Sequence, residues 1–177
     1  MERKVILYIS CSLDGFIAKQ DGDLSFLSLV EQEGEDYGYE EFVNTVDTVI
    51  VGRKTYDKII SMGFEFPHSD KESFVISRSE KPSIGSVQFY SGELTTLVKS
   101  LKTKEGKNIY CDGGAEIVNE LLKNDLIDEL IISVIPILLG NGIRLFNERS
   151  NEQKLVLLSV KQFEKGLAQF HYKIDRD

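Results

Sequence analysis

Apolar and polar residues follow two different spacings along this chain. Short runs rich in β-branched and aromatic residues predict buried strands, at residues 4–10, 47–51, 72–77, 87–90, 108–112 and 129–135. Between them, helical spacing of apolar residues predicts helices over residues 31–45 and 93–101, and two more that open at Gly52 and at Gly113-Gly114. Strands joined by helices predict an α/β fold with a mostly parallel central sheet.

Two segments near the C-terminus carry a third pattern. Residues 155–162 and 167–174 alternate between apolar and polar side chains, which is typical of an antiparallel hairpin with one face in solvent. The chain has 177 residues, 41% of them hydrophobic, which is enough for one core without disulfides or metals. We therefore expect one three-layer domain over residues 1–177, with an antiparallel hairpin completing the parallel sheet.

Charge narrows the range of partners. The formal net charge is −8, from 21 Lys and Arg against 29 Asp and Glu, and no run of basic residues interrupts the acidic balance. Such a chain repels nucleic acid and anionic membrane surfaces. Its longest uncharged apolar run, residues 130–140, is shorter than the roughly 20 residues that span a bilayer. We expect a cytoplasmic protein whose partner is a small molecule.

Cysteine and histidine suggest little chemistry. Cys11 and Cys111 are the only cysteines, their spacing matches no zinc motif, and both suit small buried apolar positions. His68 and His171 belong to no metal-binding or catalytic motif. We expect neither a metal site nor a histidine base.

Polar and glycine-rich segments follow several predicted strands, and in open α/β sheets ligands bind at the carboxyl ends of strands. The first contains Asp14, in a segment that otherwise reads as a turn. The second begins at Gly52, where a helix start and two cations suit an anion, although a solvated helix start would look the same. The P-loop spacing is absent, so this is no NTPase signature.

Two further strand ends resemble phosphate sites. Ser77-Arg78-Ser79 offers hydroxyls and a planar guanidinium to a phosphate monoester, unless it is only a surface turn. Gly113-Gly114 lets a pyrophosphate approach a helix start, unless the glycines only allow close helix packing. Together these loops would hold an extended dinucleotide. The Rossmann fingerprint G-x-G-x-x-G is absent, so a different α/β fold must hold it.

These motifs, in this order, resemble the dihydrofolate reductase superfamily over residues 4–174. The opening Ser12-Leu13-Asp14-Gly15-Phe16-Ile17-Ala18 and the turn at residues 136–142 (PILLGNG) are closest to the riboflavin-biosynthesis reductase (RibD C-terminal domain-like) branch. The resemblance implies an NADPH-dependent reductase, a homodimer, and a cis peptide at Gly113-Gly114. The matching cofactor positions are Ile17 and Ala18 for the nicotinamide; Gly52, Arg53, Lys54 and Thr55 for phosphates; Ser77 and Arg78 for the 2′-phosphate; and Gly113, Gly114, Ala115 and Glu116 for the pyrophosphate.

The substrate is less certain than the cofactor. No carboxylate of the first helix region convincingly matches the pterin-binding one of true dihydrofolate reductases, so we expect a pteridine-like or ribosylaminopyrimidine-like heterocycle and not folate. Asp112 either faces this substrate or caps the following helix. Asp112, Asp14 or a water supplies the proton.

Two alternatives to this reductase remain open. One is a catalytically silent NADP(H)-binding protein, which keeps the cofactor cleft without turnover. The other is a thiol redox protein that uses Cys11 and Cys111, because the resemblance places their strands side by side.

Overall fold

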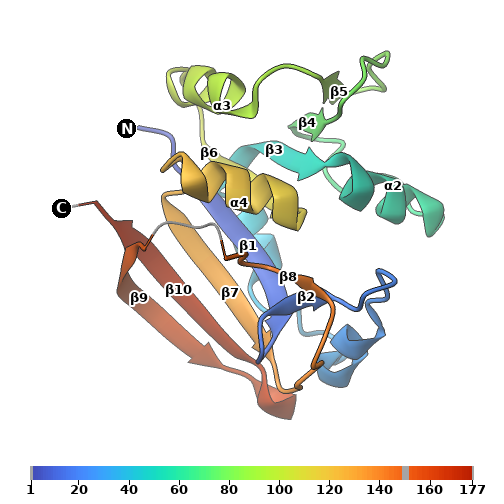
Figure 1. Ribbon diagram of the computed structural model, residues 1–177, viewed down its shortest axis with the longest axis vertical. Helices are drawn as coiled ribbons and strands as arrows, with labels where there is room; N and C mark the ends of the chain where they lie inside the picture. The colour runs from blue at the N-terminus through green and yellow to red at the C-terminus, as the bar shows by residue number, and fades with distance from the viewer. Residues whose placement is uncertain (1, 149–151, 177) are drawn as a thin grey trace.

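The predicted strands form one eight-stranded sheet in a computed structural model, which describes residues 2–148 and 152–176 (Figure 1). The strand order is β5-β4-β3-β6-β1-β7-β10-β9. The first six of these are parallel to one another, whereas β10 runs antiparallel to both β7 and β9. The fold class is confirmed. The strands are β1 (Val5–Ser12), β3 (Val46–Gly52), β4 (Glu72–Ile76), β5 (Val87–Tyr90), β6 (Asn108–Gly113), β7 (Glu129–Ile135), β9 (Lys154–Gln162) and β10 (Ala168–Asp175).

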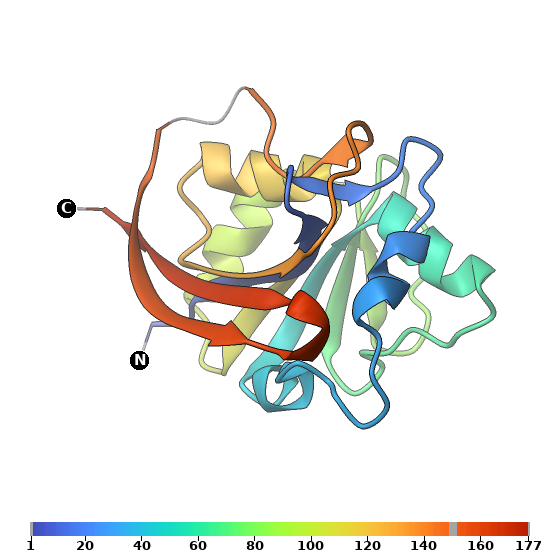
Figure 2. The same ribbon diagram turned by 90° about the horizontal axis from the view of Figure 1, so that it is seen from below.

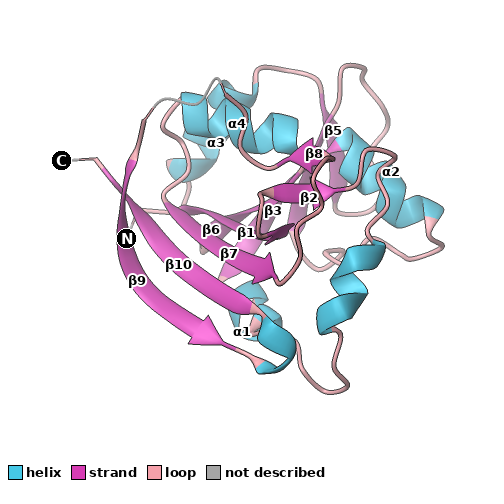
Figure 3. Ribbon diagram, turned by 60° about the horizontal axis from the view of Figure 1, so that its bottom comes forward, coloured by secondary structure: helices cyan, strands magenta, loops and turns pink. Residues whose placement is uncertain are grey.

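Helices cover both faces of the sheet, which gives the expected three layers. On one face lie α3 (Leu94–Lys102) and α4 (Ala115–Lys123), whose apolar stripes join the larger core cluster (Figure 3). On the other lie α1 (Tyr39–Val43) and α2 (Arg53–Ser61), which contribute Phe42 and Tyr56 to a second cluster. Alternate residues of the central strand β1 enter the two clusters, because side chains of a strand point to opposite faces in turn.

The helix predicted over residues 31–45 is wrong. The structure has a 3-10 helix, η1 (Ser25–Val30), then an irregular segment, and helical structure only in α1. Gly34 and Gly38 both have positive φ angles, of 78° and 82°, and such left-handed residues interrupt a helix. Sequence pattern also missed β2 (Phe16–Ala18) and β8 (Ile143–Arg144), which are too short for periodicity to show and pair as a separate two-stranded sheet.

The C-terminal hairpin is antiparallel as predicted but extends away from the helices (Figures 1 and 2). Its two strands are joined by η2 (Glu164–Gly166). Every residue of the outer strand β9 is exposed, so its two faces do not differ in the way the alternation suggested. Its apolar side chains are 44–56% exposed, at Leu155, Val156, Leu157, Leu158 and Val160.

The lengths of the helices show whether any of them could span a membrane. Within residues 2–148 and 152–176, no helix is long and apolar enough to cross a membrane.

Candidate functional site

The predicted phosphate loops meet at one edge of the sheet. β4, β3 and β6 are adjacent and parallel, so their carboxyl ends lie side by side. Gly52 is in register with Ile76, and Val51 is in register with Gly113. The turn that starts at Ser77 and the starts of α2 and α4 therefore share one edge, as the sequence predicted.

The two helix starts touch through their glycines. A Cβ on Gly52 would lie 3.2 Å from Ile117 Cγ1 and 3.4 Å from the carbonyl oxygen of Gly113. A Cβ on Gly114 would lie 3.3 Å from Thr55 Oγ1. We call Gly52, Thr55, Gly113 and Gly114 the glycine cradle. Its three glycines let the two helix starts approach closely, and helix N-termini with glycines suit a pyrophosphate, so the residues present fit that group.

The expected cis peptide at Gly113-Gly114 is wrong. No peptide bond in the described residues is cis, and the two glycines have positive φ angles of 106° and 82°. Left-handed backbone, which glycine adopts without a Cβ clash, makes the turn into α4 in this structure.

Cations surround the cradle and already have partners. Lys54 Nζ lies 3.1 Å from Glu116 Oε1, which links the first turns of α2 and α4. Arg53 Nε donates to Asp57 Oδ1 at 2.7 Å, and its guanidinium lies 5.5 Å from the centroid of Phe89. Arg78 is exposed in the turn after β4. An anion bound here would meet Arg53 and Lys54, but in competition with Asp57 and Glu116.

Asp14 fixes a loop and is poorly suited to donate a proton. Its carboxylate accepts hydrogen bonds from Ser12 Oγ at 2.6 Å and from the backbone N–H groups of Leu139 and Gly140 at 3.0 and 2.7 Å. The hydrogen bond from Ser12, with those from the two amides, lowers the pKa of Asp14 to about 2. A carboxyl group with this pKa stays ionised at neutral pH, which disfavours Asp14 as the acid.

Asp14 thereby holds the β1–β2 turn against the loop before β8. The following strand β2 contains Ile17 and Ala18 and pairs with β8. Ala18 is buried, and Ile17 packs against the core cluster that includes α4.

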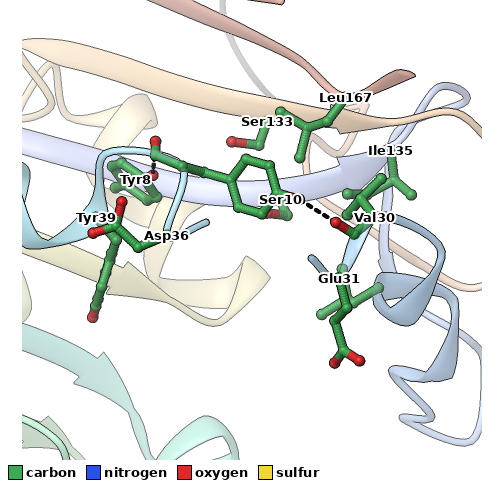
Figure 4. A pocket seen from close by; sticks show the side chains of 11 residues that line it. Tyr8, Ser10, Val30, Glu31, Asp36, Tyr39, Ser133, Ile135 and Leu167 are labelled. Atoms are coloured by element: carbon green, nitrogen blue, oxygen red, sulfur yellow. Dashed lines mark hydrogen bonds between the residues drawn. The ribbon is translucent and has the colours of Figure 1, made fainter. Parts of the chain in front are cut away.

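A pocket of about 340 Å³ lies on the α1 face of the sheet (Figure 4). Its floor comes from β1 and β7, and its walls come from η1, the irregular segment after it and Leu167. The lining residues are Tyr8, Ser10, Leu27, Val30, Glu31, Asp36, Tyr37, Tyr39, Ser133, Ile135 and Leu167. The pocket adjoins the cradle across β1: Ser10 lines it, while a Cβ on Gly113 would lie 3.1 Å from the preceding Ile9, on the opposite face.

Hydrogen bonds fix the pocket floor. Gln169 Nε2 donates to the Tyr8 hydroxyl at 3.1 Å and to Ser133 Oγ at 3.0 Å, and Tyr8 donates to the carbonyl oxygen of Tyr37 at 3.0 Å. Burial raises the pKa of Tyr8, so its hydroxyl stays protonated. A further hydrogen bond joins the Tyr37 hydroxyl to the carbonyl oxygen of Val30.

Asp112 belongs to a buried network beside this pocket. The Tyr110 hydroxyl donates to Asp112 Oδ1 at 2.7 Å, and Asp112 Oδ2 lies 3.7 Å from His68 Nε2. That same His68 nitrogen is 3.3 Å from the Tyr39 hydroxyl. The N-cap of α4 is Gly114 and no side chain caps the helix, so the alternative that Asp112 caps it is wrong. Of these four side chains, Tyr39 lines the pocket.

Sequence reasoning missed His68. Its side chain is 1% exposed and packs against Phe66 and Tyr110, and its buried Nδ1 has no hydrogen-bond partner among the described residues. No local signal marks this position, which follows a proline in a loop.

The cysteines are poorly placed for a disulfide. Their strands β1 and β6 are adjacent, but Cys111 is in register with Leu7, four residues before Cys11. Four residues of strand span about 13 Å, well beyond the roughly 7 Å limit between Cα atoms of a disulfide. Burial raises the pKa of Cys11 to about 11 and that of Cys111 to about 12. The thiol redox alternative is therefore wrong.

The described residues show no metal site either. Across residues 2–148 and 152–176, no group of three or more His, Cys, Asp or Glu side chains is arranged to hold a metal ion.

Comparison with known families decides what this fold and site belong to. The sequence profile of the RibD C-terminal domain family matches residues 3–169. The chain is a member of that family. This RibD C-terminal domain protein therefore belongs to a family of NADPH-dependent reductases with a dihydrofolate reductase-like fold.

Similar proteins support the assignment. YwjB of Bacillus subtilis (strain 168) is 46% identical over 180 residues, covering 97% of this chain and 98% of YwjB. A candidate riboflavin biosynthesis protein from Shewanella sp. PV-4 has a crystal structure with a TM-score of 0.88 and 32% identity, covering 99% of this chain and 100% of that chain.

A bifunctional relative shares the fold alone. It is the diaminohydroxyphosphoribosylaminopyrimidine deaminase/5-amino-6-(5-phosphoribosylamino)uracil reductase of Thermotoga maritima, with a TM-score of 0.72 and 17% identity. The match covers 98% of this chain and 57% of that one.

Proposed function

We propose that this protein is an NADPH-dependent reductase of a pteridine-like or ribosylaminopyrimidine-like heterocycle. One observation carries the proposal: a glycine cradle made by two helix starts adjoins, across a single strand, a pocket large enough for a small ring system. When bound, NADPH supplies the hydride. The protein's own contribution is to hold the acceptor ring close to the cofactor and to keep water away from it.

Each loop has a proposed task. The cradle and the first turns of α2 and α4, including Ala115 and Glu116, would hold the pyrophosphate, and Ser77 and Arg78 would hold the 2′-phosphate. Arg53 and Lys54 would exchange their present carboxylate partners for phosphate oxygens. Ile17 and Ala18 would border the nicotinamide.

The proton has one evident route through the protein. Tyr39 lines the pocket and contacts His68, which in turn faces Asp112. Tyr39 is therefore the residue of this network through which a proton would have to reach a bound heterocycle. Asp112 does not line the pocket. In this scheme it orients Tyr110 and His68 and does not touch the substrate.

The cofactor assignment is tested by titrating the protein with NADPH and with NADH, following nucleotide fluorescence. Arg78→Ala is expected to lose the preference for NADPH, because a guanidinium–phosphate contact contributes about 1.5–3 kcal/mol, or roughly 10- to 150-fold in affinity. Lys104→Ala is the control, since Lys104 is exposed just before β6, at the opposite edge of the sheet. Equal affinity of the wild type for both nucleotides contradicts the 2′-phosphate assignment, and binding of neither ends the proposal.

A catalytically silent NADP(H)-binding protein remains the second candidate. One observation favours it: Asp36, a carboxylate at the pocket, is occupied by the backbone N–H groups of Gly38 and Glu40 at 2.9 and 2.8 Å. These hydrogen bonds lower its pKa, so Asp36 is poorly suited to protonate a substrate. NADPH binding without oxidation, across pterins and aminopyrimidines, would establish this function instead.

A further inference from the structure

The pocket is built for a flat, largely apolar ligand. Tyr8, Tyr37 and Tyr39 present aromatic surface, and Leu27 and Leu167 close the walls between them. Its volume of about 340 Å³ is at the small end for ligand pockets, which run from about 300 to 1,000 Å³. A ring system fits this space, whereas a ring carrying a long substituent must extend through the mouth.

The charges at the pocket are all negative. Glu31 and Asp36 are its charged lining residues, and no Lys or Arg is among the described residues that line it. In Figure 4, Glu31 lies at the side of the pocket opposite Ser133 and Leu167. The surrounding segment, residues 31–41, contains six acidic residues and no basic one. A ligand that enters or protrudes here meets a negative field.

Two lysines lie near the pocket but are not among its lining residues. Lys165 Nζ donates to the backbone carbonyl oxygen of Glu31, and Lys165 is not a lining residue. Lys161 Nζ lies 3.7 Å from the position a Cβ on Gly38 would take, outside the lining as well. The basic groups suited to phosphate, Arg53 and Lys54, lie in the first turn of α2, next to the cradle at the sheet edge.

We infer that the substrate is an unphosphorylated planar heterocycle, neutral or cationic, and that this pocket discriminates against the phosphorylated form of the same compound. The inference rests on the proposed function, since it names the substrate class of that pocket. It separates this chain from the Thermotoga maritima relative, whose name specifies a phosphoribosylamino substrate. The acidic mouth discriminates by repulsion, because Glu31 and Asp36 line the pocket and no described Lys or Arg does.

The test compares a ribosylaminopyrimidine with its own 5′-phosphate, so that the ring is constant and only the phosphate differs. Binding is measured by calorimetry without cofactor, at about 0.15 M ionic strength, where charges beyond about 8 Å are largely screened. We expect the unphosphorylated compound to bind roughly tenfold tighter or more. Equal or tighter binding of the 5′-phosphate overturns the inference, as does failure of the unphosphorylated compound to bind.

A matched pair of variants isolates the cause. Glu31→Lys introduces a cation at the pocket and is expected to narrow the discrimination by roughly fivefold or more. Glu33→Lys makes the same charge change two residues away, at an exposed residue that does not line the pocket, and is expected to alter it by less than about twofold. Equal effects of the two variants overturn the assignment to the pocket.

These outcomes are distinct from failure of the reductase proposal. NADPH oxidation is assayed separately with both compounds and with 6-methylpterin. Absence of oxidation, together with selective binding of the unphosphorylated compound, rejects the reductase and keeps the substrate-class inference. Oxidation of NADPH with the 5′-phosphate but not with the other two compounds supports the reductase and rejects the substrate-class inference.

Discussion

Gly114→Ala tests the glycine cradle directly. Gly114 has φ 82° and ψ 125°, a conformation that residues with a Cβ rarely adopt. The added methyl would also lie 3.3 Å from Thr55 Oγ1 and 3.7 Å from Gly52 Cα. The backbone strain alone costs about 1–3 kcal/mol. For a chain of this size that lowers the melting temperature by roughly 2–4 °C per kcal/mol.

The effect on cofactor binding is separate from this strain. The methyl group occupies the space between the two helix starts, where a pyrophosphate would approach the backbone amides. Loss of one amide–phosphate hydrogen bond costs about 1.5–3 kcal/mol, so NADPH affinity is expected to fall roughly 10- to 150-fold. Fluorescence titration gives the affinity, and thermal unfolding with and without saturating NADPH gives an independent measure of the same loss.

Gly63→Ala is the matched control. Gly63 has φ 81°, nearly that of Gly114, and a Cβ there would have no atom within 4 Å. It follows α2, whose nine residues place it roughly 14 Å from the cradle. Gly63→Ala should therefore lose about 1–2 kcal/mol of stability through left-handed strain and keep wild-type NADPH affinity. If Gly114→Ala binds NADPH as tightly as Gly63→Ala does, the cradle does not hold the cofactor.

Two further predictions concern the rest of the molecule. Because the pKa of Asp14 is about 2 in the folded protein and 3.8 ordinarily, its stabilising contribution is complete above pH 3.8 and is lost as the pH falls toward 2. Urea unfolding of Asp14→Asn should therefore depend less on pH across that window than the wild type, and identical pH profiles contradict the anchoring role. We predict a homodimer through the edge strand β9, which pairs with β10 and whose exposed apolar side chains invite pairing with a second copy. Sedimentation should show Leu157→Lys as a monomer and Ile84→Lys, at an exposed site outside β9, as a dimer; a monomeric wild type refutes the prediction.

The sheet was predictable because its strands are buried on both faces. Apolar runs such as Val49-Ile50-Val51 are fully buried in the sheet, and all six predicted parallel strands are present. The region after β2 was not predictable in the same way. Its apolar residues have helical spacing around Tyr39, but Gly34 and Gly38 adopt left-handed backbone and confine the helix to five residues.

The cradle and the pocket differ in how far the sequence predicted them. The cradle could be located from sequence because strand ends of a parallel sheet share one edge wherever the strands lie. The pocket floor could not, because Tyr8, Ser133 and Gln169 meet only after β1, β7 and β10 have assembled. His68 was missed for the same reason, since only the folded chain buries it between Phe66 and Tyr110.

This division also explains how one fold can serve different substrates. β1 contributes Ile9 to the cradle face and Ser10 to the pocket face, so the proposed cofactor and acceptor sites lie on opposite faces of one strand buried in the sheet. The opposite wall of the pocket, from η1 to α1, is irregular and includes the acidic residues Glu31 and Asp36. Loops tolerate substitution and insertion better than buried strands do. The charge of the mouth, and with it the choice of substrate, can therefore change in this segment while the cradle keeps its geometry.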